Sequence, residues 1–251
     1  LIDPVPRLSN LADLNRVDSD LILIATSDAS IADVALSLLP VVTVPSVVLH
    51  TSGALTSNEL SILRENGVAV GSLHPLVAIS EPVSGADLLS GAYFCLEGDE
   101  AAVEAASRIV DTLGGTQFTV STAFKPLYHA GAVMAAGHLV SLIDMSIGML
   151  VAAGVEKRTA TNVLLQLVES SIKNLRSQNT HAALTGPFAR GDAQTVESHI
   201  AAMDNKELRA EKEVYLDLGL RALELSEQNG TDRTVLQPIR ELLIMAKLNS
   251  K

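Results

Sequence analysis

The pattern of apolar and polar positions divides the chain into two parts near residue 124. Before that point, apolar runs of strand length alternate with amphipathic segments of helix length. That alternation is typical of an open α/β sheet. After it, apolar residues recur at helical spacing to the end of the chain. We therefore expect a Rossmann-like α/β domain at 1–123 and an all-α domain at 124–251.

The expected elements follow from these runs and from the caps and breakers that bound them. We expect strands at 20–26, 47–50, 68–73, 93–96 and 117–120. The first run is continuously apolar, which predicts a strand buried on both faces of a parallel sheet. We expect helices at 29–39, 57–64, 97–113, 158–176, 193–203, 206–228 and 233–247, with a loop at 181–192.

The stretch 124–154 predicts a long helix that is apolar on nearly every side. Such a helix belongs in a core or at a dimer interface. A membrane span is the alternative, because about 20 apolar residues suffice to cross a bilayer. Asp144 and His138 lie inside the run, and an aspartate at the bilayer centre costs several kcal/mol. We therefore expect no membrane span.

Charge is distributed unevenly over the two parts. Residues 1–124 carry 15 acidic and 4 basic side chains, whereas residues 125–251 carry 14 of each. Nucleic-acid binding requires a basic surface, so the acidic first part argues against it. The single cysteine, Cys95, excludes an internal disulfide and fits a buried, inert thiol in a reducing compartment. With no signal peptide visible after Leu1, we expect a cytoplasmic protein.

Small and polar residues follow the first three predicted strands. Ligands of open α/β sheets bind beyond the carboxyl ends of the strands. We expect cofactor contacts at Ala25, Thr26, Ser27, His50, Thr51 and Gly53, and substrate contacts at Ser52 and His74. The alternative is that Ser27 only caps a helix and Gly53 only turns the chain.

Several familiar motifs are missing from the 251 residues. There is no G-x-G-x-x-G, the turn that binds the pyrophosphate of a dinucleotide, and no G-x-S-x-G. The six histidines are scattered and none forms H-E-x-x-H, so we expect no metal site. Lys125 and His129 stand four residues apart and share one helix face, which makes that face a candidate site.

Four motifs resemble one known family: HTSGA at 50–54, GSLHPL at 71–76, KPLYHA at 125–130 and ALTGPFARGD at 183–192. The family comprises Rossmann-like proteins with a C-terminal domain of unknown function. It is related to ketopantoate reductase, pyrroline-5-carboxylate reductase and the wider 6-phosphogluconate-dehydrogenase-like superfamily. The resemblance covers nearly the whole chain, with the motifs in family order. It implies NADP as cofactor, with NAD as the alternative, and a homodimer formed through the helices.

Two departures from the family pattern stand out. Members begin with a strand, a glycine-rich turn and a helix, so roughly 40 residues of a first βα unit are expected before Leu1. The family often has Asn near the position of Gly137, which puts one hydrogen bond to the substrate in doubt.

The resemblance also implies roles for individual residues. A lysine on the first helix of the second domain commonly acts as general acid or polarises the substrate carbonyl in relatives, and Lys125 matches its place, with His129 one turn later. A cationic group there offsets the charge that hydride transfer leaves on a carbonyl oxygen. Burial at the helix start predicts a lowered pKa for Lys125. Arg190 suits a substrate carboxylate. The alternatives are a solvated Lys125, a packed His129, and a capping or inter-subunit role for Arg190.

These observations predict an NADP-dependent reductase of a small keto acid, with ketopantoate as the best single candidate. One alternative is an imine reductase similar to pyrroline-5-carboxylate reductase. The other, from a different class, is a catalytically silent dimeric binding protein that retains the fold without the redox site.

Overall fold

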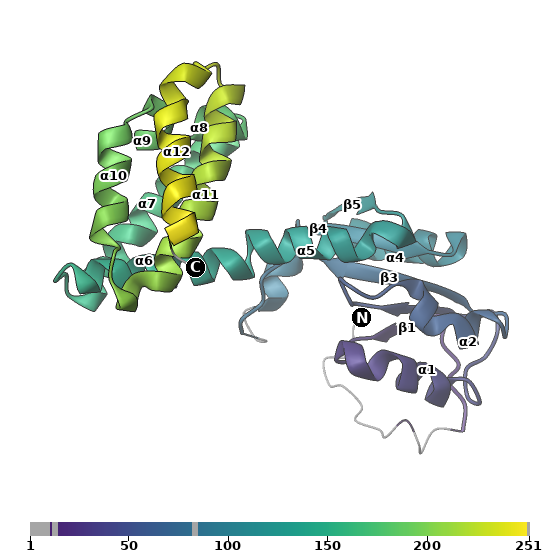
Figure 1. Ribbon diagram of the computed structural model, residues 1–251. Coiled ribbons are helices and arrows are strands. Elements are labelled where there is room, and N and C mark those ends of the chain that lie inside the picture. Colours follow the sequence, from purple (N-terminus) through teal and green to yellow (C-terminus); the bar gives the residue numbers. More distant parts are fainter. Residues whose placement is uncertain (1–10, 12–14, 82–84, 250–251) are drawn as a thin grey trace. The chain divides into compact units, whose positions relative to one another are not determined.

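The chain forms two compact units, Leu1–His138 and Leu139–Lys251, in a computed structural model that describes residues 11, 15–81 and 85–249 (Figure 1). The sequence placed the division at residue 124, where the charge pattern changes. The compact units divide 15 residues later, at 138/139, because the helix that starts at Lys125 is anchored in the first unit.

A sheet of five strands, in the order β1-β2-β3-β4-β5, forms the centre of the first unit within the described residues. The strands are β1 (Leu21–Ile24), β2 (Val47–His50), β3 (Ala69–Pro75), β4 (Tyr93–Gly98) and β5 (Thr116–Thr119). All five were expected from the sequence. β1, β2 and β3 are parallel, but β4 pairs antiparallel to β3, and β5 pairs parallel to β4. The sheet is therefore mixed, and the expectation of a parallel sheet was wrong for β4 and β5, which both run opposite to β1, β2 and β3.

Two details of the strands correct the sequence interpretation. β1 lies at the end of the described sheet and Leu23 is 47% exposed, so β1 is not buried on both faces. β4 continues through Glu97 to Gly98, and the following helix α4 begins only at Glu100. Glu97 was expected in that helix; it lies instead in a buried part of the sheet, where strand pairing decides its position.

Helices cover both faces of the sheet. On one face, α4 (Glu100–Thr112) packs its small buried residues against apolar side chains of β2, β3 and β4. On the other, α1 (Ile31–Leu38) and α2 (Ser61–Arg64) close a core that includes Val48 and Val70. Because side chains alternate across a strand, this second face also carries the polar positions of β3 that follow Val70 at every other residue.

The second unit is helical. Its elements are α6 (Gly137–Ala152), α7 (Lys157–Ser177), α8 (Thr180–Ala183), α9 (Pro187–Arg190), α10 (Ala193–Ala202), α11 (Arg209–Gln228) and α12 (Arg233–Asn249). Its core is formed by Val196, Leu216, Leu223, Leu236, Ile239 and Leu243. The segment 181–192, expected as a loop, contains two one-turn helices. Asp192 caps α10 through Thr195 N–H, as its position at the helix start favours.

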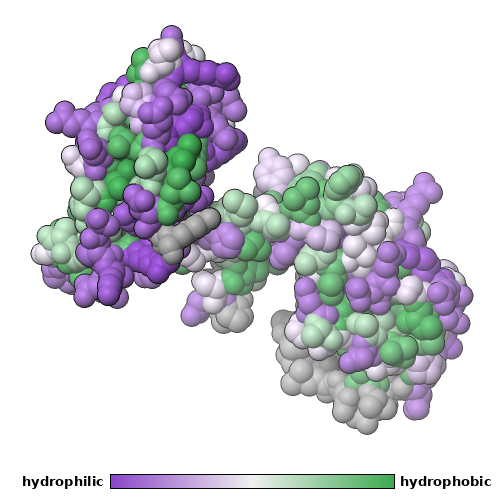
Figure 2. Space-filling model, in the orientation of Figure 1, coloured by the Kyte–Doolittle hydropathy of each residue, from purple (hydrophilic) through white to green (hydrophobic). Residues whose placement is uncertain are grey.

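The apolar stretch 124–154 is two helices, not one. α5 (Lys125–Ala135) ends at Ala136, where ψ reaches −72°, and α6 follows. Lys125 is the buried residue of α5, and α6 has none among its described residues. Figure 2 shows apolar atoms on the surface over α5, where Leu127 is 71% exposed. The stretch is thus no core helix of either unit, and the interface interpretation stays a prediction. By length and hydropathy alone, the segment Thr122–Ala152 is also long and apolar enough to cross a membrane.

Candidate functional site

A row of polar side chains crosses one face of the sheet. Ser72 and His74 alternate with apolar residues in β3, and antiparallel pairing sets them opposite Glu97 and Cys95 of β4. Residues directly opposite in neighbouring strands point to the same side. The row therefore consists of the Ser72 hydroxyl, the His74 ring, the Glu97 carboxylate and the Cys95 thiol. Helix α5 packs on it, with Lys125 bonded to Ser72 and Tyr128 to His74.

Lys125 is fully enclosed by this row. Its side chain has no exposed surface, Nζ donates a hydrogen bond to Ser72 Oγ, and Nζ lies 3.7 Å from Glu97 Oε2. Burial lowers the pKa of Lys125, against the opposing effect of the Glu97 charge. The lowered pKa expected from the sequence is confirmed. The amine is nevertheless held inside the unit and not at an open surface.

Glu97 is the counter-charge, and its oxygens are fully occupied. Ser57 donates its backbone N–H to Oε2 at 2.9 Å and its hydroxyl to Oε1 at 2.6 Å, and Thr122 donates to Oε1 at 3.0 Å. Burial acts to raise the pKa of Glu97, but the hydrogen bonds from Ser57 and Thr122 and the charge of Lys125 outweigh it, and the pKa is lowered. Such a buried, saturated ion pair positions α5 on the sheet. The catalytic role of Lys125 stays a prediction.

One turn further along α5, two histidines and a tyrosine meet. His74 Nδ1 lies 2.6 Å from the Tyr128 hydroxyl, and the rings of His74 and His129 lie edge to face with centroids 5.6 Å apart. Burial, followed by the nearby His129 and Lys125, lowers the pKa of His74 to about 4, and burial raises that of Tyr128. Near neutral pH His74 is therefore neutral and the phenol is protonated, and one proton joins Nδ1 and the hydroxyl oxygen.

Gly53 makes room for this pair of imidazoles. A Cβ built on Gly53 would lie 2.4 Å from His129 Nδ1 and 2.7 Å from His74 Nε2. Real Cβ atoms do not approach other atoms so closely, so a residue without a side chain is required. His129 Nδ1 is buried and makes no hydrogen bond to any residue that the structure describes. A buried polar atom without a partner costs about 1–3 kcal/mol and calls for a functional explanation.

The loop that carries Gly53 is shaped by three predicted ligand residues. His50 is fully buried; its Nδ1 accepts from Ser52 N–H at 3.2 Å and its Nε2 donates to the Thr56 carbonyl at 3.1 Å. Ser52 Oγ accepts from Leu55 N–H at 2.9 Å, and Thr51 N–H donates to the Ile24 carbonyl at 3.2 Å. These groups hold the loop in place, and the structure brings Gly53, His74 and His129 together beyond it.

The remaining predicted residues lie apart from the cluster or in the other unit. Ala25, Thr26 and Ser27 follow β1 and are exposed, at the same edge of the sheet as the carboxyl ends of β2 and β3. Ser27 Oγ lies 3.0 Å from Ser30 Oγ and caps no backbone N–H. Arg190 ends α9 in the second unit and is exposed.

Comparison with known families shows which family the chain belongs to. A family model described as Domain of unknown function (DUF2520) matches residues 92–222, just over half of the sequence. The chain belongs to this family. No curated protein gives a significant match to this DUF2520 chain.

Solved structures similar to this DUF2520 protein share its fold. Protein TM1727 from Thermotoga maritima superposes with a TM-score of 0.70 at 22% identity, covering 85% of this chain and 81% of that one. The "putative NADP oxidoreductase" BF3122 from Bacteroides fragilis gives 0.67 at 17% identity, covering 86% and 80%. Plasmodium falciparum pyrroline carboxylate reductase, solved with NADP bound, gives 0.54 at 14% identity, covering 99% and 86%. The DUF2520 chain therefore has the fold of these proteins.

Sequence reasoning missed three parts of the DUF2520 site: Glu97, Ser72 and Tyr128. A signal for the first two was present, because polar residues stood at alternate positions within strands that were otherwise apolar. Their pairing depended on the antiparallel register of β3 and β4, which the sequence does not specify. Tyr128 lies between the two residues that were predicted, but its contact with His74 depends on how α5 is rotated on the sheet.

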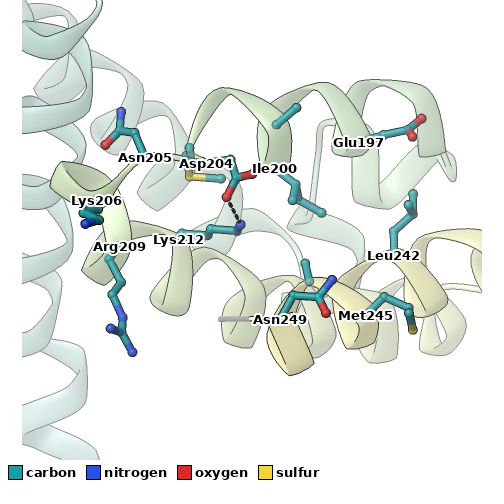
Figure 3. A pocket seen from close by; sticks show the side chains of 13 residues that line it. Glu197, Ile200, Asp204, Asn205, Lys206, Arg209, Lys212, Leu242, Met245 and Asn249 are labelled. Carbon is teal, nitrogen blue, oxygen red and sulfur yellow. Dashed lines mark hydrogen bonds and ion pairs between the residues drawn. The ribbon is translucent and has the colours of Figure 1, made fainter. Parts of the chain in front are cut away.

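The helical unit contains a separate surface cavity of about 530 Å³ (Figure 3). Lys206, Arg209 and Lys212 contribute positive charge to its wall. Lys212 Nζ lies 3.1 Å from Asp204, the ion pair drawn in Figure 3, and Arg209 Nε lies 3.2 Å from Glu213. Because carboxylates already pair with these two cations, the cavity is a weaker candidate for an anionic ligand than its basic residues suggest.

Proposed function

We propose that this protein is an NADP-dependent reductase of a small keto acid, such as ketopantoate, or of an imine, with NAD as the alternative cofactor. The observation that carries the proposal is the pair of imidazoles, His74 and His129, at the carboxyl edge of the sheet. That edge is where ligands of open α/β sheets bind. The similar fold of the NADP-bound P. falciparum reductase supports it.

The residues at this edge fit a nicotinamide cofactor in part. Ala25, Thr26 and Ser27 are exposed beyond β1, and Gly53 leaves backbone without a side chain beside the imidazoles. When bound, NADPH would supply hydride. The chain's own contribution would be the proton: reduction of a carbonyl or imine requires one at the developing oxygen or nitrogen anion. His129 is the proposed donor, and His74, held by Tyr128, positions it.

Lys125 is proposed as a positioning residue for this site. Its ion pair with Glu97 fixes the first turn of α5, and His129 lies one turn further on the same helix. The enclosed amine also favours the second candidate function, a catalytically silent dimeric binding protein. In that case the fold and the dimer persist, but no hydride transfer occurs.

The deciding experiment is a titration of the full-length protein with NADPH, followed by nicotinamide fluorescence. We expect saturable binding in the micromolar range and, with ketopantoate or pyrroline-5-carboxylate, oxidation of NADPH. His129→Ala should lower kcat by about 10²-fold, because general acid catalysis contributes that much, while cofactor binding is unchanged. Exposed His138→Ala is the matched control. Absence of binding at millimolar NADPH would overturn the reductase proposal in favour of the silent protein.

We further propose a cytoplasmic homodimer that binds neither nucleic acid nor membrane. The apolar, exposed surface of α5 and α6 supports the dimer, since Leu127, Met134 and Val140 are 71%, 66% and 68% exposed. Large exposed apolar patches mark interaction surfaces. The net charge of −11 supports the absence of nucleic acid, and the single cysteine supports a reducing compartment.

A further inference from the structure

A second cavity in the helical unit has mostly apolar walls and one buried carboxylate oxygen without a hydrogen-bond partner among the described residues. It has a volume of about 360 Å³ and lies between α6 and α11. Its α6 wall comes from residues 142, 145, 146 and 149, and its α11 wall from 211, 214, 215, 218, 219, 221, 222 and 225. Because these positions recur every three or four residues, one face of each helix lines the cavity. Leu184 and Phe188 contribute further apolar wall.

Glu211 is the acidic residue of this wall, which also contains Ser146, Tyr215 and Arg221. Its Oε2 is buried and has no hydrogen-bond partner among the described residues. Other glutamates of α11 are paired: Glu213 with Arg209 at 3.2 Å, and Glu227 with Arg240 at 2.7 Å. Removing a carboxylate oxygen from water without giving it a partner is strongly unfavourable. The helix therefore presents an acceptor that the described part of the chain does not satisfy.

Other polar side chains of the cavity wall have partners of their own. Tyr215 OH lies 2.8 Å from His199 Nδ1, and burial raises the pKa of Tyr215 to about 12. Arg221 Nη1 is ion-paired with Glu224 on the same helix. No described side chain donates to Glu211 Oε2, so this oxygen is available to a donor from outside the described chain.

We propose that this cavity binds a small organic cation, a protonated amine with an apolar body. The ammonium would donate to Glu211, and the apolar body would fill the space between α6 and α11. The volume falls within the range of small-molecule sites, about 300–1,000 Å³, and the combination of apolar walls with one placed polar group is typical of them. The proposal rests on residues of the helical unit alone and is independent of the redox proposal.

The test compares two isosteric probes, benzylamine and benzyl alcohol, by isothermal titration of the full-length protein. We expect benzylamine to bind at least about tenfold more tightly, since only it offers a charge-assisted donor. Glu211→Gln should abolish that preference. Glu213→Gln, on the same helix but exposed and outside the cavity, should retain it. Equal binding of both probes, or an unchanged preference in Glu211→Gln, would overturn the proposal.

Thermal unfolding distinguishes loss of a site from loss of the fold. Glu211→Gln replaces a carboxylate that has one buried oxygen without a partner by a neutral amide, so its Tm should equal or exceed that of the parent protein. Light scattering tests the other possible donor to Glu211, which is a basic side chain of a second copy of this chain. If benzylamine fails to bind and Glu211→Gln lowers the molar mass to that of a monomer, the cavity is a subunit contact and the amine proposal is wrong.

Discussion

At the scale of single residues, the first unit depends on a buried ion pair that is saturated with hydrogen bonds. Lys125 and Glu97 are both removed from solvent, and Ser57, Ser72 and Thr122 occupy the polar atoms around them. A buried pair of this kind contributes little net stability against an apolar replacement, but removing one partner strands the other charge. The pair instead fixes the position of α5 on the sheet, and therefore the position of His129 on that helix.

A double-mutant cycle on Lys125 and Glu97 measures the coupling free energy of this pair. Lys125→Met should destabilise the protein by about 3–5 kcal/mol, because the Glu97 carboxylate stays buried without its counter-charge. Lys125→Met combined with Glu97→Gln should recover a large part of the loss, and urea unfolding at neutral pH gives both values. Arg108→Met, which removes an exposed pair with Glu104, is the control and should change stability by less than about 1 kcal/mol. Additive effects of the two substitutions would contradict a coupled pair.

At the scale of elements, the decisive segment is 124–154. Its composition predicted a buried or interfacial helix, and the structure divides it at Ala136 into α5 and α6, both largely exposed. The sequence could not show the break, because no proline stands there and Ala136 and Gly137 differ little from the small residues around them. What remains is an apolar surface without a partner in the described chain.

Charge placed on this surface tests the proposed dimer. Leu127 and Met134 are seven residues apart and therefore lie on one face of α5. Leu127→Glu with Met134→Glu should convert a dimer into a monomer in light scattering after gel filtration, with an unchanged circular dichroism spectrum. Leu36→Glu, at an apolar position of α1 that is 55% exposed, should leave the dimer intact. A parent protein that floats with lipid vesicles, while the double variant does not, would favour the membrane alternative.

At the scale of the whole molecule, stability should depend on pH through buried histidines. His50 has no exposed surface, and burial, followed by the charge of Lys125, lowers its pKa from 6.5 to about 4. Between these values the unfolded chain binds a proton that the folded chain does not. The contribution is therefore fully present above pH 6.5 and is lost as the pH falls toward 4.

The pH dependence can be measured by urea unfolding at pH 7 and pH 4.5. For His50 alone the loss is about 3 kcal/mol, at about 1.4 kcal/mol for each pKa unit. His50→Gln should make the profile flatter over this range, although it lowers stability at pH 7. His138→Gln, at an exposed position, should leave the profile unchanged. A parent protein with equal stability at both pH values would contradict the neutral, buried state of His50.

The sequence by itself determined the order and type of the elements and the position of the candidate site along the chain. Apolar periodicity reports which faces are buried, and the five strands and the principal helices followed from it. His74 and His129 were predicted because one follows a strand end and the other lies on a helix face. Those are local properties of the chain.

Only the tertiary structure decided which of these side chains meet. The reversed direction of β4 sets Glu97 opposite Ser72, and α5 then lies with Lys125 on that pair and Tyr128 on His74. Strand direction and helix rotation result from long-range packing between segments more than 20 residues apart, so no local pattern encodes them. For the same reason the sequence located Lys125 correctly along the chain, but only the fold showed that its amine is enclosed and paired.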